Sequence, residues 1–170
     1  MSPDQRLIKA SDIGDVALAR QAISDGADID TLSYGWTALT RAARSGSLLL
    51  VQLLIKSGAD VNLESSDVSP LIMAACNGEV ETVDYLLKCG ADPNIISQVS
   101  KNSGLTCMIE PYLEIVKLLV KYGANIDHIN AVGDTIMSLA LDSDHDELID
   151  FLTTYNMRRH PLYSGILTTL

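Results

Sequence analysis

The sequence predicts an all-α solenoid, in which short helix pairs stack in a row, because one phrase returns at a fixed interval. The phrase LLIKSGADVN is echoed by DGADID, CGADPN and YGANID. Its glycine recurs at steps of 32, 32 and 33 residues, at Gly26, Gly58, Gly90 and Gly123. A second glycine column has the same period, at Gly14, Gly46 and Gly78. A period near 33 residues is typical of a solenoid of stacked units.

Apolar columns share this period and indicate two helices in each unit. Valine or isoleucine recurs at Val51, Val83, Val116 and Ile149, and leucine at Leu54, Leu86, Leu119 and Leu152. In LLLVQLLIKSG the apolar residues follow helical spacing, so we predict a helix that ends before Gly58. Glycine suits that end because it enters the left-handed region without a Cβ clash. The segment TALTRAARSG predicts a shorter first helix that ends at Gly46.

The columns divide the chain into about five units within a single domain, 1–170. We place the units at about 4–30, 31–62, 63–95, 96–127 and 128–156. An extended turn such as VNLESSDVS, which we call a finger, leads from one unit into the next. The remaining tail, 157–170, contains Ile166, Leu167 and Leu170, and we expect it to cap the last unit.

Two segments carry a resemblance to a known family. WTALTRAARSGSLLLVQLLIKSGADVN and VSPLIMAACNGEVETVDYLLKCGADPN resemble ankyrin repeats, whose pattern runs T-P-L-H-x-A-A, Gly, V-x-L-L and G-A-D-x-N. The resemblance covers residues 4 to 156. It implies helix-turn-helix units with short β-turn fingers. The family's usual histidine is replaced by Thr40, Ile72 and Ser138, so its hydrogen bond between repeats is lost in part or remade by a hydroxyl.

The fourth unit departs from the pattern. Asn94 and Leu105 are 11 residues apart, against 9 for Asn62 and Leu71, so the finger at 95–104 is about two residues longer. We predict a first helix, LTCMIEP, that is one residue short, and a different turn after it, because Pro111 cannot adopt a positive φ. The longer finger is either a contact device or a neutral change in a surface loop.

Composition and charge limit the partners. The formal net charge is −10, which argues against nucleic acid or an anionic membrane surface as the main partner. A basic protein partner and simple solubility explain the charge equally well. The sequence has no run of about 18 apolar residues, so we expect no membrane span. Without a secretion signal, three cysteines fit free thiols in a cytoplasmic protein, which we expect to be a monomer.

The residues that carry chemistry elsewhere have structural explanations here. His128, His145 and His160 are far apart in the sequence. A metal at Asp144, His145 and Asp146 is disfavoured because neighbours at a helix start point apart, and Ser143 or Asp144 is expected to cap that helix. Glycine-rich phosphate loops are absent from the sequence. We therefore predict no catalytic residue, metal or cofactor, and thus no enzyme.

The resemblance places partner binding on a concave face made of fingers and first helices. The predicted binding residues are Ser33, Tyr34, Trp36, Arg44, Ser66, Val68, Asn77, Lys101, Asn102, Asp134 and Asp142. Ser65 and Ser103 are expected to be exposed beside them. Tyr34 and Trp36 are the strongest signal, since aromatic residues on exposed turns are typical of interfaces. Alternatively, Trp36 packs on the next finger.

Three functions compete. The first is a protein-binding module, in the form of an inhibitor or immunity-type protein that covers a basic partner, or of an adaptor, scaffold or effector. The second is an enzyme with a cysteine or metal site. The third is a spacer whose faces bind nothing.

Overall fold

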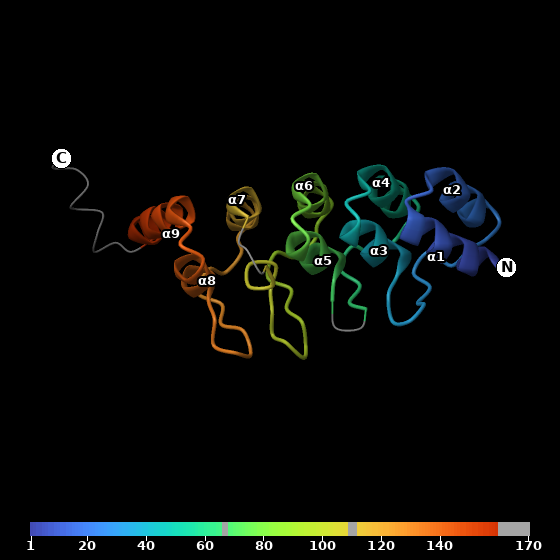
Figure 1. Ribbon diagram of the computed structural model, residues 1–170. Helices are drawn as coiled ribbons and strands as arrows, with labels where there is room; N and C mark the ends of the chain where they lie inside the picture. Colours follow the sequence, from blue (N-terminus) through green and yellow to red (C-terminus); the bar gives the residue numbers. More distant parts are fainter. Residues whose placement is uncertain (66–67, 109–111, 160–170) are drawn as a thin grey trace.

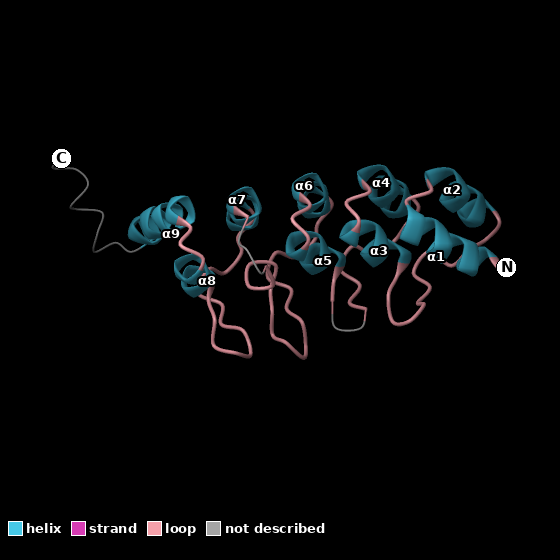
Figure 2. Ribbon diagram, viewed as in Figure 1, coloured by secondary structure: helices cyan, strands magenta, loops and turns pink. Residues whose placement is uncertain are grey.

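Short helices stand side by side in two layers from the N-terminus to the C-terminal end in the computed structural model, which describes residues 1–65, 68–108 and 112–159 (Figure 1). The inner layer contains α1 (Pro3–Ile13), α3 (Ala38–Arg44), α5 (Pro70–Cys76) and α8 (Ile136–Asp142). The outer layer contains α2 (Val16–Ser24), α4 (Leu48–Lys56), α6 (Val80–Lys88), α7 (Leu113–Lys121) and α9 (Asp146–Arg159). The fingers project beyond the inner layer as loops (Figure 2). This arrangement confirms the all-α solenoid.

The inner helices begin at side-chain caps that recur with the repeat. Thr37, Ser69 and Thr135 each accept a hydrogen bond from a backbone N–H three residues later. Such a cap satisfies one of the N–H groups that a helix start leaves without a partner. Pro70 follows Ser69 at the first helical position, where the absence of an N–H does no harm.

The glycine prediction is confirmed at the ends of the outer helices. The φ angles are +86° at Gly26, +98° at Gly58, +92° at Gly90 and +91° at Gly123. The second glycine column continues in the last unit with Asp144, whose φ is +50°. Asp144 therefore does not cap α9, and Ser143 donates its hydroxyl to Leu139 O over 2.8 Å. The expected cap is wrong: the first turn of α9 closes on His145 O.

The core consists of the predicted columns. Leu54, Leu86, Leu119 and Leu152 are at most 1% exposed. Val51, Val83 and Val116 are fully buried, whereas Ile149 in the last unit is half-buried. Ala42 and Ala43 are also fully buried, as the close approach of neighbouring helices requires.

Asp and Asn side chains at the base of the fingers connect the units in a ladder. Asp30, Asn62 and Asn94 each accept a hydrogen bond from a backbone N–H of the next unit, at Asp60, Asp92 and Asn125. The asparagines also donate, Asn62 to Gly90 O and Asn94 to Gly123 O. An asparagine can do both because its amide carries an acceptor and a donor. This ladder has no counterpart among the sequence predictions.

The fourth unit lacks the expected first helix in its described part. Residues 104–108 form a turn in which Thr106 N and Cys107 N both bond to Ser103 O. The predicted helix LTCMIEP is therefore wrong over these residues, while 109–111, with Pro111, lie outside the described residues. Ser103 Oγ also accepts from Leu105 N, and such local bonding competes with helix formation.

The end of the chain only partly tests the predicted tail. α9 continues to Arg159, so 157–159 are helical. Residues 160–170 lie outside the described residues, and with them the expected cap formed by Ile166, Leu167 and Leu170.

Candidate functional site

The finger of the second unit is a tight hairpin that presents one aromatic ring to solvent. Ser33 and Trp36 exchange two backbone hydrogen bonds, of 3.0 and 3.1 Å. Between them, Tyr34 and Gly35 have φ angles of +51° and +76°, as two-residue hairpins require. The left-handed region costs a residue other than glycine about 1–2 kcal/mol. Tyr34 is nevertheless held there with 98% of its surface exposed.

The Trp36 side chain, which follows this tip in the sequence, is half-buried. The guanidinium of Arg44 lies 5.3 Å from the centre of the Trp36 ring and that of Arg41 5.9 Å away. These distances allow cation–π attraction to the ring. A cavity of about 200 Å³ opens here, lined by Asp12, Trp36, Arg41, Arg44 and Ser45. The tryptophan thus contributes to a small cationic recess as well as to the finger.

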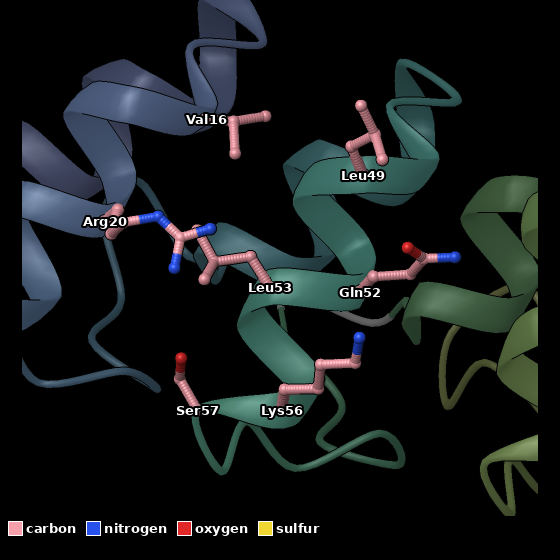
Figure 3. A pocket seen from close by; sticks show the side chains of 7 residues that line it. All are labelled: Val16, Arg20, Leu49, Gln52, Leu53, Lys56 and Ser57. Carbon is pink, nitrogen blue, oxygen red and sulfur yellow. The ribbon is translucent and has the colours of Figure 1, made fainter.

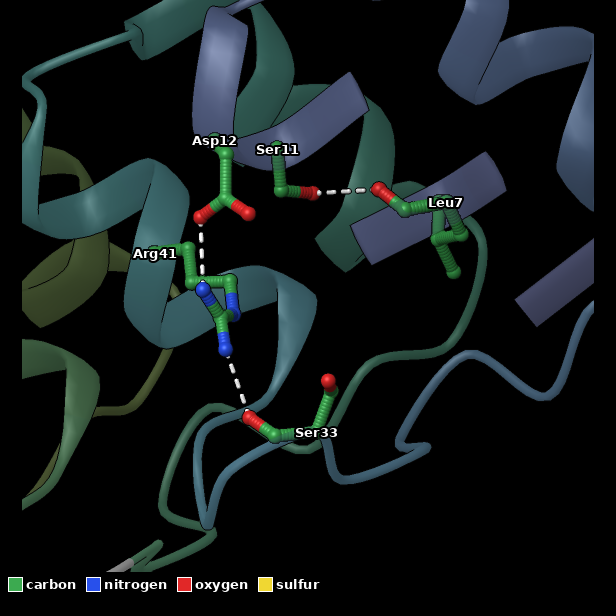
Figure 4. Close-up of polar contacts among 5 residues, drawn as sticks. All are labelled: Leu7, Ser11, Asp12, Ser33 and Arg41. Atoms are coloured by element: carbon green, nitrogen blue, oxygen red, sulfur yellow. Dashed lines mark hydrogen bonds and ion pairs between the residues drawn. The ribbon is translucent and has the colours of Figure 1, made fainter. Parts of the chain in front are cut away.

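Arg41 fixes the recess to the first unit, and the predictions did not include it. Its guanidinium donates to Asp12 Oδ1 over 2.6 Å and to Ser33 O over 2.5 Å (Figure 4). Beside this contact, Ser11 donates to Leu7 O within α1 over 2.9 Å. Because Arg41 is tied to the finger and to α1, Arg44 is left as the exposed cation at the mouth of the recess.

The third unit presents less side-chain surface than predicted. Ser65 is 2% exposed and its hydroxyl lies 3.0 Å from Thr40 Oγ1, so its expected exposure is wrong. This contact is the predicted hydroxyl substitute for the family's histidine bond. Val68 is half-buried and Asn77 is exposed. Ser66 lies outside the described residues.

The longer finger of the fourth unit contacts the finger of the fifth unit. Lys101, which is exposed with a φ of +54°, accepts at its carbonyl from His128 Nε2 over 2.5 Å. Asn130 donates to the side chain of Asn102 over 3.1 Å. Ser103 is 4% exposed, so its expected exposure is wrong as well. The extra finger length therefore connects two units. His128 and Asn130 were missed because the pattern does not show which fingers touch.

The fifth unit completes the predicted set with acidic side chains. Asp134 is half-buried and Asp142 is exposed. Residues 128–159 contain six carboxylates and two arginines. None of the six carboxylates forms an ion pair with a described residue. This end of the row therefore carries uncompensated negative charge.

Cys76 and Cys107 are neighbours across the third and fourth units. Cys76 donates its thiol to Cys107 O over 3.4 Å, and Cys107 donates to Ile72 O over 3.4 Å. The Cys107 thiol and the backbone lower the pKa of Cys76 against the effect of burial. The contact with Cys76 and burial raise the pKa of Cys107 well above its usual value. None of the described histidines hydrogen-bonds a cysteine, so no Cys–His pair forms there.

Residues 1–65, 68–108 and 112–159 contain no group of three or more His, Cys, Asp or Glu side chains that could hold a metal ion. The helices among them are too short or too polar to cross a bilayer.

The fold and this face together define a class: an all-α repeat protein that displays fingers beside its inner helices. The family model for ankyrin repeats, in three copies, matches residues 7–97, more than half of the chain, and the chain belongs to the ankyrin repeat family. Ankyrin repeats are generally protein–protein interaction modules and typically are not enzymes. Among curated proteins, none matches the sequence.

Proposed function

We propose that the chain binds a partner protein on the face formed by the fingers and inner helices, with Tyr34 and Trp36 at the centre of the contact. The observation that carries this proposal is the exposed Tyr34 ring at positive φ, two residues before Trp36, whose ring lines a recess with Arg44. A bulky residue held in a costly conformation, with its ring in water, contributes little to the free energy of folding. An aromatic ring next to an arginine is a typical centre of binding energy.

The charge distribution supports a basic patch on that partner. The six uncompensated carboxylates of residues 128–159 lie at the far end of the row from the recess. Such a partner would place an aromatic or acidic side chain against Arg44 and basic side chains near Asp134 and Asp142. It would then match the charge at both ends of the row. If the contact extends along the whole row of units, the partner cannot bind anything else through the covered surface, which is the inhibitor form of the proposal. In the adaptor form, the bound partner stays active.

The test is capture by the immobilised chain from a lysate of the cells that express it, followed by titration of the captured protein. We expect Trp36→Ala and Tyr34→Ala each to weaken binding at least about tenfold, as loss of a central interface aromatic does. Tyr122→Ala removes a half-buried ring at the end of α7, away from the fingers, and is the matched control.

Stability separates this role from a structural one. Tyr34 is 98% exposed, so Tyr34→Ala should leave the melting temperature unchanged. Trp36→Ala should cost about 1 kcal/mol, because it removes the ring that the two arginines face. If both variants bind the partner at full strength, the proposed face is wrong. A partner released by rising salt would support the basic patch, because salt screens opposite charges.

A further inference from the structure

A second cavity lies on the outer layer, away from the fingers, between α2 and α4. It has a volume of about 600 Å³. Two cationic, three apolar and two polar residues line it: Val16, Arg20, Leu49, Gln52, Leu53, Lys56 and Ser57. Figure 3 shows Val16 and Arg20 on one helix facing Leu49 and Leu53 on the other. We call this cavity the α2–α4 groove.

Leu49 gives the α2–α4 groove an apolar surface that the outer helices α6, α7 and α9 do not have at the same repeat position. The same repeat position is occupied by Glu81 in α6, Glu114 in α7 and Glu147 in α9. A glutamate is expected there because the position faces water. Leu49 is instead 68% exposed. Together with the half-buried Val16 and Leu53, it gives the groove an apolar wall.

The two cations of the α2–α4 groove, Arg20 and Lys56, lack the acidic partner that Lys88, the equivalent of Lys56, has in α6. In α6, Lys88 is neutralised by Asp84, one helical turn earlier, at 2.5 Å. The corresponding pair in α4 is Lys56 and Gln52, so the intrahelical partner is missing. Neither Lys56 nor Arg20 forms an ion pair within the described part of the chain. The α2–α4 groove thus presents free positive charge on a chain whose net charge is −10.

We propose that the α2–α4 groove binds an acidic amphipathic segment of a partner protein. Apolar side chains of the segment would cover Leu49 and its neighbours, and its carboxylates would pair with Arg20 and Lys56. Helix α4 has nine residues, which corresponds to about 13 Å, the length of two to three turns of a bound helix. An extended polyanion such as nucleic acid or a lipid surface would be repelled by the rest of this acidic chain.

The probe is a fluorescein-labelled peptide of about 12 residues with leucine and glutamate at helical spacing, and its binding to the full chain is measured by anisotropy. We expect binding that weakens as salt rises. Leu49→Glu, which installs the residue found at this position in α6, α7 and α9, should weaken it at least about tenfold, because it removes apolar contact and adds a like charge. Lys56→Gln should weaken it about three- to fivefold, since the lysine is exposed.

The matched control is Lys121→Gln, which removes the same charge at the same repeat position of α7. Its affinity for the peptide should stay within about twofold of the unmodified chain. Equal losses for Lys56→Gln and Lys121→Gln would overturn the proposal, because the attraction would then be general. Equal binding of a peptide with lysine in place of glutamate would overturn it too. Self-association of the chain would overturn it as well, if Leu49→Glu abolishes the association and the peptide does not compete with it. A second copy of the chain would then occupy the groove.

This proposal does not depend on the face formed by the fingers. The peptide assay uses the α2–α4 groove alone, and Trp36 and Tyr34 take no part in it. Circular dichroism of each variant shows whether the helices are intact. Since Leu49 and Lys56 are exposed, we expect unchanged spectra and melting temperatures.

Discussion

The first three units and the last two are held together by different contacts. Between the second and third units, inner helix α3 packs on α5, and the buried hydroxyls of Thr40 and Ser65 meet at 3.0 Å. Between the fourth and fifth units, the described part of the fourth contributes no inner helix, and the fingers are joined through His128 and Asn130. The contrast teaches that a longer finger can join two units where the described residues of one unit form no inner helix.

The two ends also differ in charge. Residues 1–62 contain six cationic and seven acidic residues, which is close to neutral. Residues 128–159 contain two cationic and six acidic residues. The two cations that we propose to contact partners, Arg44 and Lys56, therefore lie in the first two units. The comparison yields three predictions, which follow in order of decreasing effect.

The largest effect is expected from truncating the leucine column. Leu86 and Leu152 are equally buried, but Leu86 has units on both sides and Leu152 belongs to the last one. Leu86→Ala should lower the free energy of unfolding by about 2–5 kcal/mol and destabilise its neighbours. Leu152→Ala should fall at the lower end of this range. Urea unfolding followed by circular dichroism measures both. Equal losses would remove the distinction between interior and terminal units.

An intermediate effect is expected at the hydroxyl contact. Thr40 Oγ1 lies 2.9 Å from Thr37 Oγ1 and 3.0 Å from Ser65 Oγ, and all three residues are buried. Thr40→Val keeps the shape but leaves the other two hydroxyls without this partner, which should cost about 1–3 kcal/mol. Thr153→Val, on the exposed face of α9, is the control. Thermal unfolding that shifts equally in both variants would show that the contact does not stabilise the stack.

The smallest effect, and one of opposite sign, is expected at the start of the ladder. Asp30 accepts from Asp60 N, but its carboxylate cannot donate to Gly58 O as Asn62 donates to Gly90 O. Asp30→Asn supplies that donor and should stabilise the chain by about 0.5 kcal/mol at neutral pH. Differential scanning calorimetry can detect this gain. A lower melting temperature at neutral pH would contradict it.

The pH dependence of the same variant provides a second check. Desolvation, with the negative charges of Asp60 and Asp28, raises the pKa of Asp30 above its usual 3.8. The folded chain then binds a proton more readily than the unfolded chain, so stability falls as pH rises through the window above 3.8. Asp30→Asn should lack this fall. Its advantage over the unmodified chain should therefore grow from acid to neutral pH.

The sequence was sufficient where one residue type performs the same task in every unit. Gly58 and Gly90 end their helices in the left-handed region, and Leu54 and Leu86 fill the core, so period and chemistry were enough. In the fourth unit, the repeat period alone does not predict the structure. The spacing of LTCMIEP predicts a helix, but Pro111 has no N–H to offer the carbonyl of Cys107, and that carbonyl accepts from Cys76.

The candidate faces depend on contacts between units, which a repeat pattern does not contain. Arg41 reaches Asp12 in α1, 29 positions earlier, so its place in the recess could not be derived from the second unit alone. Ser65 was expected to face solvent because it lies in a finger, yet it turns inward toward Thr40. Leu49 could have been noticed, because the glutamates at its repeat position are visible in the sequence.

The position of Trp36 also makes the chain its own optical reporter. It is the single tryptophan, and it sits in the second unit beside two guanidinium groups. Its emission therefore follows the N-terminal half, whereas far-ultraviolet ellipticity averages over every helix. Denaturation curves from the two signals coincide only if the row melts as one cooperative block. A gap between them would show the order in which the two halves come apart.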